Sequence, residues 1–255
     1  MKEAIGNRMK EFYENRTRYL LPRRTYTLIR IDGKAFHTYT KGLNRPFDEG
    51  LMNDMDETAK YLCKNIQGAK FAYVQSDEIS ILLTDFETLT TDTWFDGNIQ
   101  KIVSVSASLA TSAFNRFRYI RHITDLPDLL SAKSLFPLKD AEFDARVWTI
   151  PNNIEVENYF IWRQQDATRN SILSVAQTLY SHKEMSNKKC NILQEMIFQK
   201  GINWNDYSLG EKNGRLIVKE TYLKGESNRT KWVSIGAETF SQNREILENL
   251  IPKYT

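Results

Sequence analysis

The chain has 255 residues, which fits one large domain or two small ones and allows a sizeable core. Hydrophobic residues make up 41% and charged residues 26%, and these proportions exclude a disordered chain, a collagen and a coiled-coil rod. The 35 Lys and Arg residues against 32 Asp and Glu give a net charge of +3, which is compatible with a nucleic-acid partner but does not require one.

Cysteine and histidine are too scarce for a disulfide framework or a zinc site. The cysteines are Cys63 and Cys190, far apart in the sequence, and the chain has 3 histidines. The N-terminus lacks an apolar signal core, and the most apolar stretch, residues 102–114, is too short to span a bilayer. We therefore expect a cytoplasmic protein without a membrane partner.

The hydrophobic pattern alternates between helical and strand periods. In chain order it predicts a helix at 1–18, a strand at 26–31, a helix at 51–66, strands at 70–74 and 79–83, a helix at 99–118, a strand at 143–148, helices at 155–180 and 187–200, and a hairpin from 216–222 and 231–234.

This order predicts an α+β fold. We expect a ferredoxin-like split-βαβ palm with an antiparallel sheet and helices on one face, followed by a C-terminal helical and hairpin extension. Residues 1–150 would form the palm-like catalytic region, and residues 151–255 the extension packed on it as one unit.

The first candidate site begins where the strand at 26–31 ends. Asp32 follows that strand directly, so its carboxylate should lie at a sheet edge near solvent. Gly33 would let the backbone turn sharply, and successive N–H groups in such a turn can cradle phosphate oxygens. An ordinary Asp-Gly turn is the alternative interpretation.

A second acidic motif, residues 76–78, lies between two predicted strands. Asp77 and Glu78 are adjacent, which is costly unless a cation neutralises them, although a solvated turn is the alternative. In a split-βαβ unit the first strand lies beside this hairpin, so Asp32 and Asp77 should face each other. Two such carboxylates and a glycine carbonyl can hold two Mg²⁺ ions for phosphoryl or nucleotidyl transfer.

Polar and basic residues form the third group of candidates. Residues 162–170 place many polar side chains in a predicted helix, and they favour either a charged solvent face or contact with RNA. Basic residues elsewhere are candidates for following an RNA backbone. They are Arg116, Arg118, Arg121, Lys188, Lys189, Arg229 and Lys231.

Four motifs, in this order, resemble the tRNA(His) guanylyltransferase superfamily. They are Arg-Ile-Asp-Gly at 30–33, extended by Phe-His at 36–37, Gln-Ser-Asp-Glu-Ile-Ser at 75–80, Phe-Asp-Ala-Arg-Val at 143–147, and Trp-Arg-Gln-Gln-Asp at 162–166. The resemblance implies a nucleotidyltransferase that adds nucleotides to the 5′ end of tRNA in the 3′–5′ direction. It also implies a polymerase-like palm, tRNA and nucleoside triphosphates as partners, and a homotetramer.

The resemblance also assigns roles to particular residues. It implies that Asp32, the Gly33 carbonyl and Asp77 bind two Mg²⁺ ions, with Glu78 as a supporting catalytic carboxylate. ATP or GTP would be the activating nucleotide. The residues implied to bind nucleotide are Asp32, Gly33, Lys34, Ala35, Phe36, His37, Arg45, Ser76, Asp77 and Asn170, and Asp48 matches a further element of the family together with Arg45.

One departure from the family pattern bears on the reaction. The guanylyltransferases proper carry His-Ile-Asn-Asn-Leu-Tyr where this chain has Thr-Arg-Asn-Ser-Ile-Leu at 168–173. Asn170 is kept, whereas Thr168 and Ser171 replace a His and an Asn. This favours templated repair of 5′-truncated tRNA. The alternatives are addition of a single G to tRNA(His), a palm-type nucleotidyl cyclase and a non-catalytic RNA-binding module.

Overall fold

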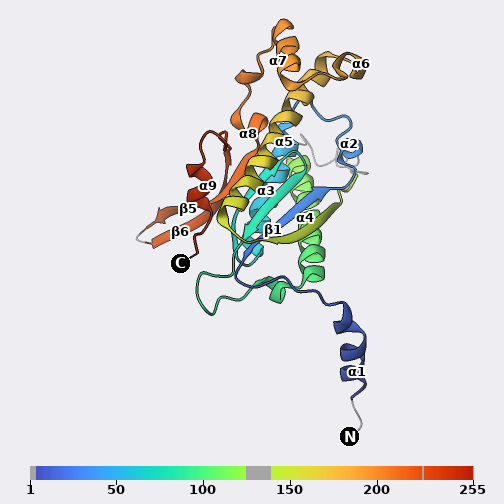
Figure 1. The fold of residues 1–255 in the computed structure, drawn as a ribbon. Coiled ribbons are helices and arrows are strands. Elements are labelled where there is room, and N and C mark those ends of the chain that lie inside the picture. The colour runs from blue at the N-terminus through green and yellow to red at the C-terminus, as the bar shows by residue number, and fades with distance from the viewer. Residues whose placement is uncertain (1–3, 125–138, 226, 255) are drawn as a thin grey trace.

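A computed structural model describes residues 4–124, 139–225 and 227–254. Within these ranges six strands form one sheet in which all neighbours are antiparallel (Figure 1). The strands are β1 (Tyr26–Gly33), β2 (Ala69–Gln75), β3 (Glu78–Leu83), β4 (Phe143–Ile150), β5 (Arg215–Lys224) and β6 (Ser227–Gly236). The mixed fold with an antiparallel sheet that the sequence predicts is confirmed.

The strand order places β1 between two strands that each carry an acidic residue opposite Asp32. The order is β4-β1-β3-β2-β5-β6. The connection from β1 to β2 contains α3 (Glu49–Asn65), and that from β3 to β4 contains α4 (Ile99–Thr124). In the register, Asp32 of β1 lies opposite Glu78 of β3 and opposite Asp144 of β4. Carboxylates therefore gather at the end of β1.

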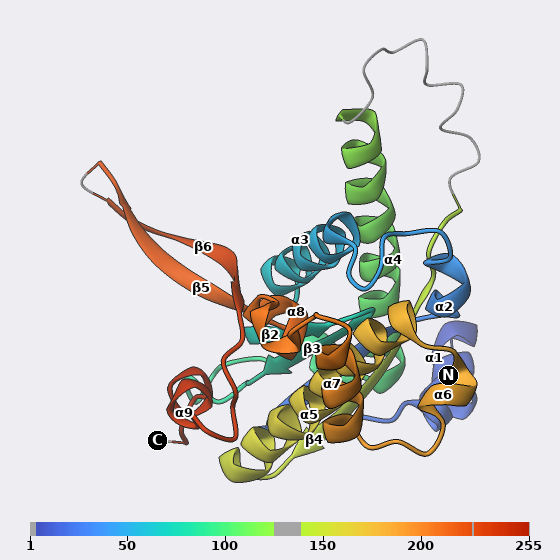
Figure 2. The same ribbon diagram turned by 90° about the horizontal axis from the view of Figure 1, so that it is seen from above.

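Helices lie on both faces of this sheet (Figure 2): the two helices of residues 1–150, α3 and α4, share one face as predicted, and a helix of the C-terminal extension covers the other. On one face, α3 and α4 share a core with Ile29 and Ile31. On the other, α5 (Asn153–Leu179) buries Tyr159 and Phe160 in a core with Leu28. The physical reason is that β1 is apolar on both faces, and each face needs a covering layer.

The shorter elements lie at the ends of the fold. The remaining helices are α1 (Ile5–Phe12), α2 (Phe36–Tyr39), α6 (His182–Met185), α7 (Cys190–Gln199), α8 (Leu209–Asn213) and α9 (Glu245–Leu250), and the 3₁₀ turns are η1 (Glu14–Thr17), η2 (Trp94–Gly97) and η4 (Trp204–Asp206). α1 stands away from the sheet in Figure 1, and none of its residues is buried. The helix predicted at 1–18 is thus an α-helix followed by a 3₁₀ turn.

The C-terminal hairpin extends the same sheet. β5 pairs with β2, with Ile217 opposite Ala72, so residues 1–150 and 151–255 contribute strands to one sheet. The hairpin of β5 and β6 then continues beyond β2, and its outer residues are exposed. α7 packs against the second half of α5 through Leu193 and Ile197.

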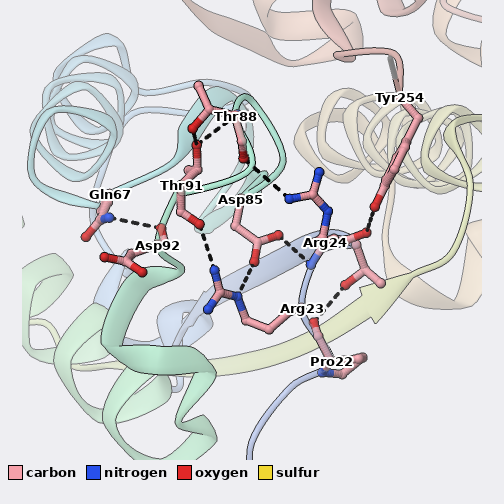
Figure 3. A network of polar contacts seen from close by, with 10 residues as sticks. Pro22, Arg23, Arg24, Gln67, Asp85, Thr88, Thr91, Asp92 and Tyr254 are labelled. Atoms are coloured by element: carbon pink, nitrogen blue, oxygen red, sulfur yellow. Dashed lines mark hydrogen bonds and ion pairs between the residues drawn. The ribbon is translucent and has the colours of Figure 1, made fainter.

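A buried aspartate fixes the chain where it enters β1 (Figure 3). Asp85 lies in the loop after β3 and accepts hydrogen bonds from Arg23 Nε and from the backbone N–H of Arg24, each at 2.8 Å. Arg23 also donates to the carbonyl of Thr91 at 2.7 Å. The Asp85 side chain thereby ties this loop to the segment before β1.

We expect Asp85→Ala to lower the free energy of unfolding by about 1–3 kcal/mol, because the part-buried Arg24 N–H loses its acceptor. Urea denaturation of the two proteins measures the difference. Asp92→Ala is the matched control: Asp92 is exposed, and it accepts a hydrogen bond from Gln67 through its backbone carbonyl, which the substitution keeps. Equal losses in both variants would contradict the role given to Asp85.

Candidate functional site

Asp32 and Asp77 lie together at one end of the sheet. Asp32 is near the end of β1, and Asp77 lies in the two-residue turn between β2 and β3. The Gly33 N–H donates to the Asp77 carbonyl at 3.1 Å, so the two acidic segments are bonded to each other. The structure therefore brings together the two aspartates that the sequence predicts as neighbours.

The environment of these carboxylates opposes negative charge. Burial raises the pKa of Asp77 to about 6, and the nearby charges of Asp32 and Glu78 add to the effect. Burial also raises the pKa of Asp32, with further contributions from Glu78 and Asp144 that the charges of Arg146 and Arg30 only partly offset. No described Lys or Arg forms an ion pair with Asp32 or Asp77. The site therefore favours an added cation.

The donor set suits a hard cation rather than a transition metal. Within the described ranges, no group of three or more His, Cys, Asp and Glu residues is arranged to hold a metal ion. What the site offers is two crowded carboxylates with carbonyl oxygens beside them. Mg²⁺ prefers oxygen ligands, needs few carboxylates and completes its shell with water and phosphate oxygens. The residues present therefore fit the predicted Mg²⁺ site at Asp32, Gly33 and Asp77.

The raised pKa of Asp77 predicts a pH-dependent stability in metal-free protein. Folding raises this pKa from an ordinary 3.8 to about 6, so the charged form is penalised above pH 6 and the penalty is absent below pH 4. Asp77→Asn should therefore stabilise the metal-free protein at pH 7, by at most about 2 kcal/mol after solvent screening, and not at pH 3.5. Denaturation curves with a chelator at the two pH values test this. An equal effect at both would contradict the shift.

Glu78, by contrast, forms an ion pair with an arginine. Its carboxylate accepts from Arg163 Nε at 2.8 Å and from Arg163 Nη2 at 2.6 Å, and both side chains are buried. Ser80 Oγ donates to the same carboxylate at 3.3 Å and lies 2.8 Å from the Tyr159 hydroxyl. Glu78 is thus a support beneath the aspartates. Sequence reasoning missed its partner, because a buried arginine in a polar helical motif looks like a solvent-facing one.

A cavity of about 140 Å³ opens beside the turn that carries Asp77, with Ser76 of that turn in its lining. A second hollow adjoins it, and both are lined by Pro46, Asp48, Leu51, Ser76 and Ser174. The predicted nucleotide-binding residues found here are Asn170 and Ser76 in the first hollow and His37, Arg45 and Ser76 in the second.

The walls of the cavity are fixed by local backbone geometry. Asp48 caps α3 by accepting from the Leu51 N–H at 2.8 Å, and it also accepts from the Asn44 N–H at 3.1 Å. Ser76 has a φ of 47°, in the left-handed region that non-glycine residues rarely adopt. Such strained residues gather at functional sites, where the surrounding structure holds them.

Residues 33–36 are arranged differently from the prediction. Gly33 ends a strand and does not form a sharp turn. A Cβ on it would lie 2.2 Å from the Phe36 ring, so the close approach of that ring explains the glycine. Phe36 is core, packed 5.2 Å from the ring of Phe143. Ala35 takes the left-handed conformation before α2, and Lys34 pairs with Glu142 on the α4 side.

The polar motif on α5 is largely structural. Gln164 donates to the Glu238 carbonyl at 2.7 Å and accepts from the Phe240 N–H at 2.7 Å. Ser171 is buried, donates to the Thr168 carbonyl at 3.0 Å, and lines the cavity. The interpretation of residues 162–170 as a solvent face is therefore wrong for Gln164, because the helix lies between the sheet and the C-terminal segment, whereas Arg169 and Asn170 are exposed.

Two of the basic residues proposed for RNA contact are also structural. Arg118 and Arg121 of α4 converge on the buried Asp54 of α3, at 3.3 Å and 2.6 Å. These contacts join the two helices on one face of the sheet. Arg116 lies 4.9 Å from the centre of the Tyr61 ring. The sequence gives no sign of these pairings because α3 and α4 are far apart along the chain.

Comparisons with known proteins agree with this arrangement. Residues 6–151 match the family model described as tRNAHis guanylyltransferase. A bacterial tRNA(His) guanylyltransferase-like protein in complex with ATP is 43% identical, with a TM-score of 0.84 over 98% of this chain and 99% of that chain. One in complex with GTP is 43% identical, with a TM-score of 0.76 over 96% and 98%. The probable tRNA(His) guanylyltransferase of Drosophila melanogaster is 27% identical over 89% of this chain and 80% of its own length.

The fold and these matches define an enzyme of the nucleotidyltransferase class. The chain belongs to the tRNA(His) guanylyltransferase family, which confirms the resemblance seen in the four sequence motifs. No helix among the described residues is long and apolar enough to cross a membrane.

Proposed function

We propose that this enzyme adds nucleotides in the 3′–5′ direction to the 5′ end of truncated tRNA, choosing each nucleotide by pairing with the opposite strand. The observation that carries the proposal is the position of the crowded pair Asp32 and Asp77 beside a cavity lined by Ser76 and Asn170. Family membership supports tRNA as the substrate. The ATP and GTP complexes of the bacterial relatives support those nucleotides as activators.

The reaction has two transfers. First, the 5′-monophosphate of the RNA attacks the α-phosphate of ATP or GTP, and pyrophosphate leaves. The 3′-hydroxyl of an incoming nucleoside triphosphate then attacks the activated 5′ phosphate, and the nucleoside monophosphate leaves. Two Mg²⁺ ions, held by Asp32, Asp77 and the Gly33 carbonyl, would stabilise negative charge on the transferring phosphate.

Other residues of the chain would position the substrates. Arg45 and His37 line the second hollow, where a triphosphate or base would lie, and Asn170 of α5 lines the adjoining cavity. The N–H groups of Gly33 and Lys34 already donate to Asp77 and Glu142 carbonyls. Phosphate contact in this segment would therefore fall to the backbone of residues 35–37. The palm-like, ferredoxin-type sheet and the homotetramer belong to the same proposal.

The templated choice of nucleotide separates this function from the addition of a single G. Pairing geometry can select among four bases without a separate protein pocket for each. We expect a truncated tRNA with G opposite the gap to take C, and one with A opposite to take U. The experiment supplies labelled nucleotides with tRNAs that differ only in that base, and sequences the extended product.

Each alternative gives a distinct product in the same experiment. Addition of G whatever base stands opposite would establish the addition of a single G and overturn templated repair. A cyclic nucleotide formed without RNA would show a cyclase. Binding of tRNA without extension, under conditions where the nucleotide also binds, would show an RNA-binding module.

A further inference from the structure

Helix α5 presents one large aromatic side chain to solvent near the carboxylates. Trp162 is 52% exposed, whereas its neighbours Tyr159 and Phe160 are buried at 7% and 0%. An exposed tryptophan leaves a large apolar and polarisable surface in contact with water. The exposure of such a large side chain at this point of the helix therefore needs an explanation.

A chain of contacts locates Trp162 beside the reacting end of the sheet. The Arg163 guanidinium lies 4.6 Å from the centre of the Trp162 ring. The same guanidinium binds the Glu78 carboxylate at 2.6 Å, and Glu78 lies opposite Asp32 in the sheet. The indole is therefore linked to Asp32 through Arg163 and Glu78, on the face of the sheet that α5 covers.

Basic side chains lie on the same face. Arg30 is two residues before Asp32 on β1, so both side chains point to this face, and Arg146 lies opposite Arg30 on β4. Arg30 Nε is buried and has no hydrogen-bond partner. The Arg146 side chain is about half exposed and 3.5 Å from Asp144. These two guanidiniums offer positive charge near Asp32 on the face of the sheet that α5 covers.

The cavity and the indole lie at different points along α5. Asn170, which lines the cavity, is eight residues after Trp162, or about 12 Å further along α5. A reaction that joins a nucleotide to an RNA end needs two binding places that flank the reacting phosphate. The cavity provides one, and the indole with its arginines provides the other.

We propose that Trp162 is the stacking platform for the terminal base at the 5′ end of the RNA, with Arg30 and Arg146 beside the backbone phosphates. The inference rests on the proposed function and adds a binding residue to it. Every base has a flat face, so stacking on an indole accepts any terminal nucleotide. That tolerance is what an enzyme needs when the base at the growing end changes after each addition.

The test compares Trp162→Ala and Trp162→Phe with the parent protein on a 5′-phosphorylated acceptor-stem duplex. We expect Trp162→Ala to weaken RNA binding on the order of tenfold or more, with the KM for the nucleoside triphosphate unchanged. Trp162→Phe should recover most of the loss, because it keeps a ring. Phe198→Ala on α7 is the matched control, since Phe198 is 62% exposed and should leave binding unchanged.

A second substrate shows whether the lost interaction is stacking. With an abasic 5′-terminal nucleotide, the parent protein and Trp162→Ala should bind equally. Equal binding of the two proteins to the intact duplex would overturn the proposal. A raised KM for ATP with unchanged RNA binding would assign the indole to the activating nucleotide and also overturn it. RNA binding is measured directly, so the result stands whether or not extension occurs, and failure of extension tests the proposed function separately.

Discussion

Replacing Asp32 or Asp77 by alanine should abolish nucleotide addition and leave the fold intact. Asp32 lies near the end of β1 and Asp77 in the turn between β2 and β3, outside the apolar core clusters, and each is crowded by like charge. Losing either would remove charge stabilisation worth several kcal/mol in the transition state, a rate loss on the order of a thousandfold. Single-turnover rates at saturating Mg²⁺, with circular dichroism to confirm folding, measure the effect.

Asp144→Ala is the sharpest control for this prediction. Asp144 lies opposite Asp32 on the neighbouring strand, carries the same group and is largely exposed. We expect its loss to change the rate only a few-fold. If the Asp144 variant were as slow as the other two, any acid at this end of the sheet would matter equally. If the Asp32 or Asp77 variant kept near-normal turnover, the assigned pair would be wrong.

Arg163→Met should be the most destabilising single change at the site. It leaves the buried Glu78 carboxylate without its two charged hydrogen bonds, and breaking a buried pair in this way costs about 3–5 kcal/mol. The double variant Glu78→Met/Arg163→Met should recover most of the stability, since no buried charge remains. Urea denaturation of the single and double variants measures both effects.

The double variant also separates stability from positioning. If the pair holds the turn that carries Asp77, the refolded double variant should have a lower kcat with a KM for nucleotide close to that of the parent. Arg169→Met is the control, because Arg169 is exposed and pairs with Asp166 at the surface; its loss should cost below about 1 kcal/mol. A double variant with normal kcat would show that the pair serves folding alone.

Much of the fold follows from local pattern. The strand at β1 is predicted by its run of β-branched residues, and the helices α3 and α5 by their apolar spacing. The neighbouring positions of Asp32 and Asp77 follow from topology, because the first strand of a split-βαβ unit lies beside the hairpin that follows it. These features depend on residues close in sequence or on a general rule of chain connection.

What the sequence could not predict depends on which distant side chains meet. The pairing of Glu78 with Arg163, and the covering of a second sheet face by α5, are set by packing between segments far apart in the chain. Gly33 shows that contacts between residues close in the sequence can be just as hard to predict. Its sequence context indicates a turn, whereas the Phe36 ring packed over it is the reason for the glycine.

The hydrogen bond from the Gly33 N–H to the Asp77 carbonyl ties the turn that carries Asp77 to β1. This attachment has a consequence for hydrogen exchange. β1 and β3 are interior strands of the sheet, so amides such as that of Ile79 should exchange with solvent deuterium only when the whole domain unfolds. One wall of the cavity and its adjoining hollow, within residues 40–48, is partly exposed loop and should exchange by local opening. Nucleotides would then enter past a wall that opens often, while the aspartates stay fixed until the protein itself unfolds.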